Sequence, residues 1–327
     1  MRVYITGVFE AMARGLFASL IVGTILNQLG ELTGFGLLQG AGQAAVLLMG
    51  PAIAAALAFE REAAAFTTLG AVVAGTLGAG NFVGGSLAGV GEPVGALLSA
   101  LVAVELGRQL EGRSRFDILI IPAATILAGA FVAQTAAPYI SAALMSVGSF
   151  VNEFTQLQPL PMGILLGTVM GMLLTMPVSS AGLAIAIGLD GLAAGAAVAG
   201  GAAQMVGFAV AGFPENRISG LFTQGFGTSM LQFSNIIQNP LIWLPPTLAG
   251  ALGGGLSATV FEMRTTSVGA GMGTSGLVGQ LTTHAVMGDS AILSIILLHF
   301  VIPAIVSFGL AHSMRACGLI RQGDMQL

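Results

Sequence analysis

Residues 191–213, GLAAGAAVAGGAAQMVGFAVAGF, consist almost entirely of alanine, glycine and valine, and Gln204 is their one strongly polar side chain. The run carries no charge and is long enough for a helix of about 20 residues to cross the hydrocarbon core of a bilayer. Similar apolar runs recur along the chain, and the charged residues stand between them. The sequence therefore predicts several membrane-spanning helices.

Composition supports the same class. Of the 327 residues, 55% are hydrophobic and 7% are charged, and the mean hydropathy is +0.93. A soluble domain carries roughly 25% charged residues, so most of this surface must face lipid. The 49 glycines fit a helical bundle in which small residues let backbones approach closely. Short segments that alternate apolar and polar residues, typical of outer-membrane barrels, are not found in the sequence.

The predicted fold is an all-α polytopic membrane protein with about eight to ten spans. The apolar runs that we interpret as spans cover residues 13–29, 36–59, 63–85, 93–108, 118–137, 160–187, 191–213, 240–261 and 291–312.

Residues 138–158 are different from the spans around them. Apolar residues recur there at helical spacing against polar ones, which predicts an amphipathic helix in the membrane interface. This linker would join an N-terminal membrane half, residues 1–137, to a C-terminal membrane half, residues 159–327. Similar runs that open at Gly15 and Gly163 are compatible with an internal repeat, although sequence rich in Ala and Gly produces such similarity easily.

Arginine placement predicts the orientation. Arg61 and the cluster at 108–115 follow the second and fourth spans, so they lie on one side, which the positive-inside rule makes cytoplasmic. Both termini are expected on that side. We expect no cleavable signal, because Glu10 interrupts the first residues and no small-residue cleavage pattern follows.

Two glycine-rich stretches share the pattern Gly-x-Gly-Thr-Ser, at 225–229 and 271–275. The first continues to Asn239 with Ser, Asn and Gln, and the second to Gln280. Irregular polar backbone is tolerated at membrane depth only where it is buried in protein or lines an aqueous cavity. We therefore predict two re-entrant hairpins or broken helices that bind a polar solute. Close helix packing through small residues is the alternative.

Few groups suggest other chemistry. Glu215 and Arg217 could pair with each other or belong to a solvated loop, and His299, inside the last span, fits a hydrogen-bonding role better than proton transfer. The single Cys317 excludes an intrachain disulfide and a multi-cysteine metal site. No phosphate-binding loop or basic aromatic patch occurs, so we expect no cofactor, no metal and no nucleic acid.

Several motifs together resemble one family. They are residues 225–232 (GFGTSMLQ), Asn235-Ile236, residues 239–246 (NPLIWLPP), residues 269–280 (GAGMGTSGLVGQ), and the stretch 162–210 with Pro177-Val178-Ser179-Ser180. This sequence is similar to the EIIC-like permeases of the phosphotransferase system, in particular to the branch described as perfringolysin-regulator type. The resemblance covers most of the chain and is strongest from Leu160 onward.

The resemblance implies a multi-pass protein of the bacterial inner membrane, a homodimer, and a transport domain around two re-entrant hairpins. Pro214-Glu215-Asn216 looks like the counterpart of the family's Asn-Glu-Pro turn, although only the Glu keeps its place. Asn239-Pro240 is similar to its Leu-Asn-Pro motif, with Gln238 where the Leu stands. The phosphate-donating Cys and His domains are not in this sequence, so separate phosphotransferase subunits would have to supply phosphate.

We therefore predict a permease, not an enzyme, that moves a small polar or anionic solute, such as a sugar, by alternating access. A membrane-embedded solute sensor that regulates gene expression through a partner is the alternative, and short hydrophilic loops favour transport. The residues predicted to contact the solute are Gln204, Glu215, Asn216, Thr228, Gln232, Asn235, Asn239, Thr274, Ser275 and Gln280.

Overall fold

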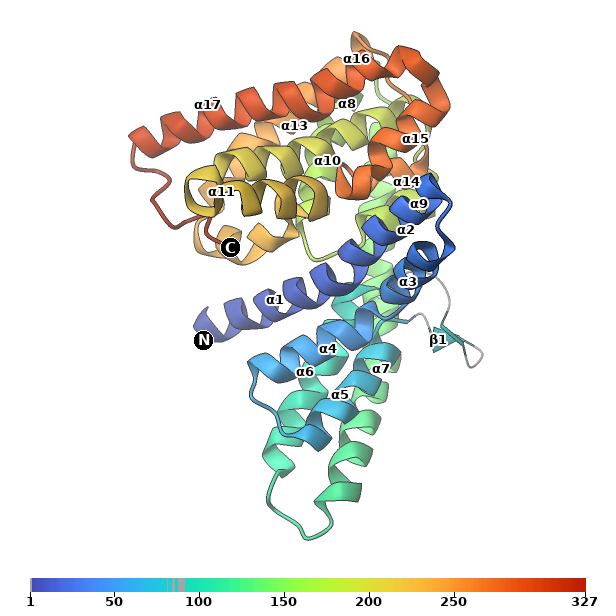
Figure 1. Cartoon of the computed structure of the whole chain (residues 1–327), viewed down its shortest axis with the longest axis vertical. Coiled ribbons are helices and arrows are strands. Elements are labelled where there is room, and N and C mark those ends of the chain that lie inside the picture. The colour runs from blue at the N-terminus through green and yellow to red at the C-terminus, as the bar shows by residue number, and fades with distance from the viewer. Residues whose placement is uncertain (1, 81, 84–85, 88–91) are drawn as a thin grey trace. The chain divides into compact units, whose positions relative to one another are not determined.

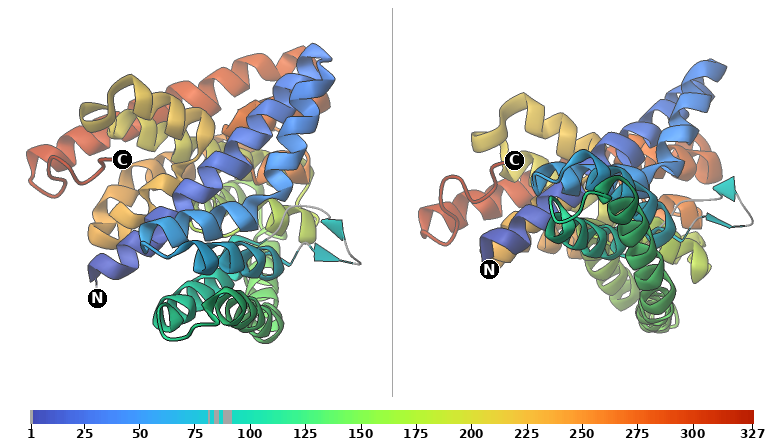
Figure 2. Two further views of the ribbon diagram at one scale, coloured as in Figure 1. Left: turned by 60° about the horizontal axis from the view of Figure 1, so that its bottom comes forward. Right: turned by 90° about the horizontal axis from the view of Figure 1, so that it is seen from below.

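The computed structural model of the chain describes residues 2–80, 82–83, 86–87 and 92–327. By their internal contacts the residues divide into two compact units, residues 1–144 and 145–327, and the boundary falls within one long helix. Figures 1 and 2 show that both units are built from helices. The predicted all-α polytopic class is confirmed.

The described residues of unit 1 form six helices, one π-helical turn, a short antiparallel hairpin and most of a seventh helix. They are α1 (Arg2–Leu16), η1 (Phe17–Ile21), α2 (Val22–Thr33), α3 (Gly36–Leu47), α4 (Met49–Glu60), α5 (Ala65–Gly78), β1 (Phe82–Val83), β2 (Ser86–Leu87), α6 (Pro93–Leu110) and α7 (Asp117–Phe154).

The loops after α4 and α6 meet at one end of unit 1. Arg61 Nε donates to Glu105 Oε1 at 2.9 Å, and Glu111 Oε1 accepts the Ala64 N–H at 2.9 Å and the Thr67 hydroxyl at 2.6 Å. The two loops therefore lie on the same side, as the arginine pattern predicted. Which side of the membrane this is stays a prediction.

Two predicted spans divide into two helices, and a third, residues 63–85, is helical only as far as Gly78, where α5 ends. The run 36–59 forms α3 and α4, which meet at a bend of 62°. The run 160–187 forms α8 (Pro159–Thr175) and α9 (Ser180–Ala186), because Pro177 has no backbone N–H to donate and its ring excludes the helical conformation from Met176, whose ψ is 158°.

The predicted boundary at residue 137 is not a helix end. Helix α7 continues from Asp117 to Phe154, so the expected span and most of the expected linker form one helix. At 1.5 Å per residue its 38 residues extend over roughly 57 Å, more than the ~30 Å of a hydrocarbon core. The interfacial position of residues 138–158 stays a prediction.

Unit 2 starts within α7 and holds α8, α9 and the remaining elements. These are α10 (Gly191–Ala211), α11 (Phe213–Phe222), η2 (Thr223–Gly227), η3 (Ser229–Gln232), α12 (Phe233–Gln238), η4 (Pro240–Trp243), α13 (Leu244–Thr259), α14 (Ser267–Ala270), η5 (Ser275–Leu277), α15 (Val278–Met287), η6 (Gly288–Ser290), α16 (Ala291–Ile295), η7 (Ile296–Val301) and α17 (Ile302–Ala316).

Glycine allows α8, α10 and α13 to pack at the centre of unit 2. A Cβ placed on Gly167 would lie 2.4 Å from the carbonyl oxygen of Gly250, and one on Gly200 would lie 2.0 Å from that of Gly167. No side chain fits at such distances. The close helix packing that the glycine content predicted thus holds for these three helices.

Both Gly-x-Gly-Thr-Ser stretches interrupt helices. The first passes from the π-helical turn η2 through an extended Thr228 (φ −159°) into the 3₁₀ turn η3, and the second passes from α14 through turns into η5. Positive φ angles at Gly273 and Gly276 need a residue without a Cβ. The prediction of broken helices is confirmed, whereas their re-entrance into the membrane stays a prediction.

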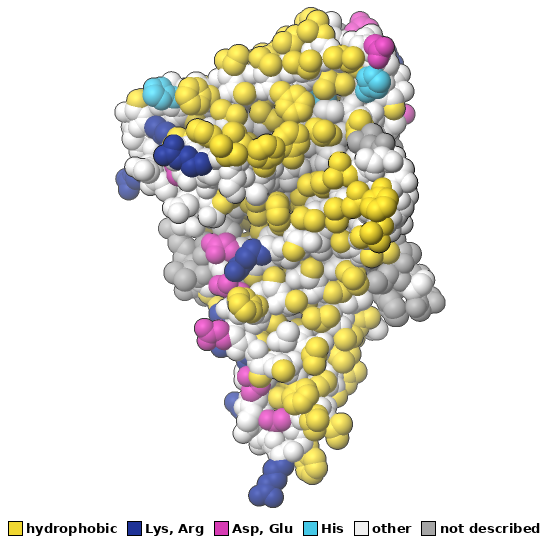
Figure 3. All heavy atoms as spheres, viewed as in Figure 1, with side chains coloured by type: hydrophobic (Ala, Val, Ile, Leu, Met, Phe, Trp, Pro, Cys, Tyr) yellow, Lys and Arg dark blue, Asp and Glu magenta, His cyan; other side chains and the backbone are white. Residues whose placement is uncertain are grey.

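Six helical segments in the described part of the chain are long and apolar enough to cross a membrane, or up to seven if α3 and α4 form one span. Two shorter apolar helices, α5 and α8, add to these. Large hydrophobic side chains stay exposed on both units, as at Leu119, Phe131 and Ile305 (Figure 3). Such surfaces fit a bilayer, where lipid covers them. The count of eight to ten spans stays a prediction.

Candidate functional site

Five polar side chains form a buried cluster in the middle of unit 2. Four segments supply them: the last residue of α8, the middle of α10, the turn η3, and η4 with the start of α13. We call this set, Thr175, Gln204, Ser229, Trp243 and Thr247, the central cluster. Thr175, Gln204 and Ser229 are completely buried.

The hydrogen bonds of the central cluster fix the orientation of Gln204. The Trp243 indole N–H, which can only donate, lies 3.1 Å from Gln204 Oε1, and Thr175 donates to the same oxygen at 3.2 Å. Gln204 Nε2 donates to the Thr247 hydroxyl at 2.9 Å. Because the Thr175 hydrogen is used, Ser229 Oγ–H donates to Thr175 across 2.8 Å. Gln204 was among the residues predicted from the sequence, whereas the other four were not, although Trp243 is the only tryptophan in the chain.

The two Gly-x-Gly-Thr-Ser stretches touch each other. The Thr274 hydroxyl donates to the carbonyl oxygen of Gly225, and its oxygen lies 3.4 Å from Met205 Sδ. Ser275 Oγ is buried without a hydrogen-bond partner among the described residues. Thr228 Oγ1 accepts the Met230 N–H at 3.1 Å and so caps η3. The second stretch thus supports the first, next to the central cluster.

Gln280 lies apart, in α15, and pairs with His299 of the π-helical turn η7. Gln280 Nε2 lies 2.8 Å from His299 Nδ1, and both side chains are buried. An amide nitrogen donates, so His299 Nδ1 accepts and its proton is on Nε2. Within the described residues, neither that Nε2 nor Gln280 Oε1 has a partner. The predicted hydrogen-bonding role of His299 agrees with this contact.

The remaining predicted residues contact the segment after α17. We call residues 318–327 the tail segment, and Glu215, Asn216, Gln232, Asn235 and Asn239 the amide groove. Asn216 and Gln232 donate to the Met325 carbonyl at 2.7 and 2.9 Å, and Asn235 donates to that of Gln326 at 2.9 Å. Asn239 donates to the Leu319 carbonyl at 3.1 Å and to Asp324 Oδ2 at 2.7 Å.

The suggested pairing of Glu215 with Arg217 is wrong. Glu215 accepts two parallel hydrogen bonds from Arg315, at 2.8 and 3.0 Å, and 3% of its side chain is exposed. Arg217 has a non-helical backbone inside α11, with φ 54° and ψ −147°. The partner stands 100 residues away in sequence, and no local spacing could have indicated it.

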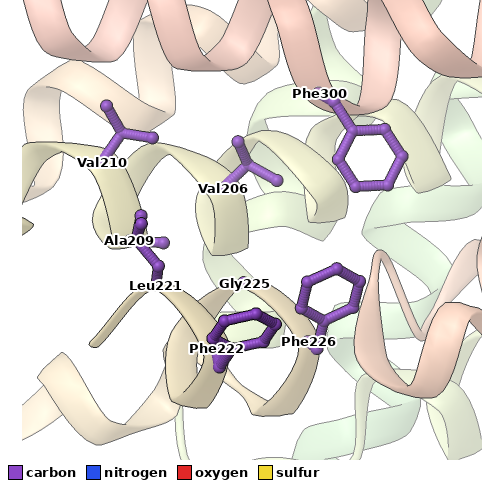
Figure 4. A pocket seen from close by; sticks show the side chains of 8 residues that line it. All are labelled: Val206, Ala209, Val210, Leu221, Phe222, Gly225, Phe226 and Phe300. Carbon is purple, nitrogen blue, oxygen red and sulfur yellow. The ribbon is translucent and has the colours of Figure 1, made fainter. Parts of the chain in front are cut away.

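A pocket of about 250 Å³ lies beside the first stretch (Figure 4). Residues of α10, α11 and η2, together with Phe300, line it, and none has a polar side chain: Val206, Ala209, Val210, Leu221, Phe222, Gly225, Phe226 and Phe300. This pocket is therefore not the polar chamber that the sequence predicted.

Broken helices around a buried polar cluster, in a chain with several apolar spans, define a polytopic helical membrane protein. The chain matches the family described as "Phosphotransferase system, EIIC" over residues 6–327. It belongs to that family, and it is a membrane permease component of the phosphotransferase type. No curated protein matches the chain in a sequence search.

Proposed function

We propose that the chain translocates a small, neutral, polyhydroxylated solute such as a sugar, and that the central cluster binds it. The observation that carries this proposal is the completely buried Gln204 amide, which three hydrogen-bonding side chains from other elements surround. Amides, hydroxyls and an indole edge can exchange these mutual bonds for the hydroxyls of a sugar. The family match supports a permease and lends no support to the sensor alternative.

Charge favours a neutral solute over an anion. The central cluster has no ionisable side chain. The nearby Arg315 is already bound by both of its terminal nitrogens to Glu215, so its charge is matched. An anion would enter buried surroundings without a cation, which is costly.

The rest of the assignment follows the family resemblance. We propose a homodimer in the bacterial inner membrane, with cytoplasmic termini, alternating access, and separate phosphotransferase subunits that phosphorylate the solute. The broken helices at 225–229 and 271–275 are the proposed moving elements, because they have few helical hydrogen bonds to lose.

Thermal unfolding of the purified chain in the presence of a solute panel tests the binding step, since a ligand of the folded state raises Tm. Neutral sugars and polyols are expected to raise Tm, and sugar acids and sugar phosphates are not. Gln204→Leu should remove the shift, whereas the same substitution at the exposed Gln134 should keep it. An equal shift in Gln204→Leu, or stabilisation by anions alone, would contradict the proposed site.

A further inference from the structure

The tail segment folds back after α17 and is anchored by two apolar side chains. The chain reverses at Gly318, whose φ is 72°. Ile320 and Met325 are then 2% and 0% exposed, in a cluster with Phe208, Ile236 and Ile242. The rest of the segment is mostly polar, so these two anchors hold it against unit 2.

The tail segment uses the hydrogen-bonding capacity of the amide groove. Gln232 Nε2 donates to both Gln224 Oε1 and Met325 O, and Asn235 Nδ2 donates to both Gln232 Oε1 and Gln326 O. Each amide nitrogen has two hydrogens, and here both are used. A solute cannot bind these donors while the tail segment stays in place.

Its backbone also meets the acceptors of the groove. The Leu327 N–H donates to Asn216 Oδ1 at 2.9 Å, and the Gly323 N–H donates to Glu215 Oε1 at 3.4 Å. Peptide groups thus supply donors and acceptors as a small polar solute would. The amide groove and the tail segment are therefore complementary in their hydrogen-bond donors and acceptors.

The occupied groove adjoins the central cluster. Trp243 packs against the apolar cluster that holds Met325, and its indole N–H donates to Gln204. The turn η3 carries Ser229 of the central cluster at one end and Gln232 of the groove at the other. Movement of the tail segment would therefore uncover the Gln232 end of η3 and the apolar cluster beside Trp243, both of which adjoin the central cluster.

We infer that the tail segment is an internal plug, which occupies the amide groove and must leave before a solute reaches the central cluster from that side. This inference rests on the proposed function, because it regulates the same site. Only molecules with a detached tail segment bind solute, so the apparent affinity falls to the intrinsic affinity multiplied by the detached fraction.

A cysteine placed as a reporter in the amide groove tests whether the tail segment covers the groove, and the test needs no knowledge of the solute. In a Cys317→Ser background, Gln232→Cys is treated with a membrane-impermeant, positively charged methanethiosulfonate in detergent solution. Adding Ile320→Asp, which puts a charge into the apolar cluster at the other anchor, should raise the labelling rate at least about tenfold. The milder Met325→Ala should raise it less, and Gln322→Ala, an exposed residue of the same segment, should leave it unchanged. Equal rates in all four proteins would overturn the plug.

Binding measurements distinguish a failure of the plug inference from a failure of the proposed function. With Gln232 intact, the tail variants are titrated with the neutral sugar panel. Met325→Ala and Ile320→Asp should bind at least about threefold more tightly than the native chain and Gln322→Ala. Equal affinities would overturn the plug and leave the proposed function standing. If no variant binds any sugar although the reporter is exposed, the proposed function fails and the inference fails with it.

Discussion

At the scale of single residues, the polar side chains of the central cluster have partners from distant segments. Gln204 could be recognised in the sequence because it is isolated among apolar residues. Thr175, Ser229 and Thr247 could not, because threonine and serine in apolar helices usually bond their own backbone, as Thr168 does with Ile164. Only the fold shows which hydroxyl turns towards another element.

The Trp243 indole N–H provides a test at one atom. Trp243→Phe keeps an aromatic ring and removes the donor to Gln204 Oε1. Since Thr175 still donates to that oxygen, we expect a modest loss of stability, about 1 kcal/mol. Sugar affinity should fall more clearly, by about tenfold, which titration calorimetry would measure. Unchanged affinity would place the solute away from the indole.

The ion pair of Glu215 and Arg315 gives a second test. Glu215→Gln leaves the partly buried guanidinium without its charge partner, which costs about 3 kcal/mol. Arg315→Lys keeps the charge but loses the two parallel bonds, so the expected loss is smaller. Thermal unfolding of both variants shows which of them loses more stability. A Tm in Glu215→Gln equal to that of the native chain would show that the pair contributes nothing.

At the scale of elements, glycine decides how closely helices approach. Gly167→Ala puts a methyl group 2.4 Å from the Gly250 carbonyl oxygen, so α8 and α13 must separate. We expect a loss of about 1–3 kcal/mol, typical of overpacking. The matched control is Gly309→Ala in α17, where a Cβ meets nothing within 4 Å. The Tm of Gly167→Ala should be lower than that of Gly309→Ala and of the native chain. Equal Tm values would contradict the close contact between α8 and α13.

The irregular elements were predictable from the sequence, but the contacts between them were not. The polarity of residues 225–239 and 269–280 predicted broken helices correctly, because stretches that combine Gly with Ser, Thr, Asn and Gln form helices poorly. The ten predicted contact residues nevertheless lie in separate places: the central cluster, the junction at Thr274, the Gln280 pair and the amide groove. Composition indicates that a segment is irregular, but contacts between segments depend on tertiary packing.

At the scale of the whole molecule, the apolar composition and the family match agree on a polytopic permease. Helix α7 was predicted in two pieces, because the pattern of apolar and polar residues changes near residue 137. The backbone nevertheless stays helical from Asp117 to Phe154. The covering of the amide groove by the tail segment could not be predicted, because its polar residues resemble those of an ordinary exposed terminus.

Orientation can be tested with the native Cys317, which is exposed. Arginine placement predicts that it faces the cytoplasm. A membrane-impermeant maleimide should therefore label Cys317 in inverted inner-membrane vesicles and not in right-side-out vesicles, with Cys317→Ser as the control. The opposite pattern would reverse the proposed topology.

Solute exchange through the native chain tests the central claim most directly. Proteoliposomes loaded with an unlabelled sugar that raises Tm receive the same sugar in labelled form outside. Two threonines of α8 form a matched pair: Thr175 lies in the central cluster, and the exposed Thr168 bonds its own helix. We predict that the native chain and Thr168→Val exchange the sugar and that Thr175→Val, though folded, does not. Exchange by Thr175→Val at the native rate would contradict a solute path through the central cluster.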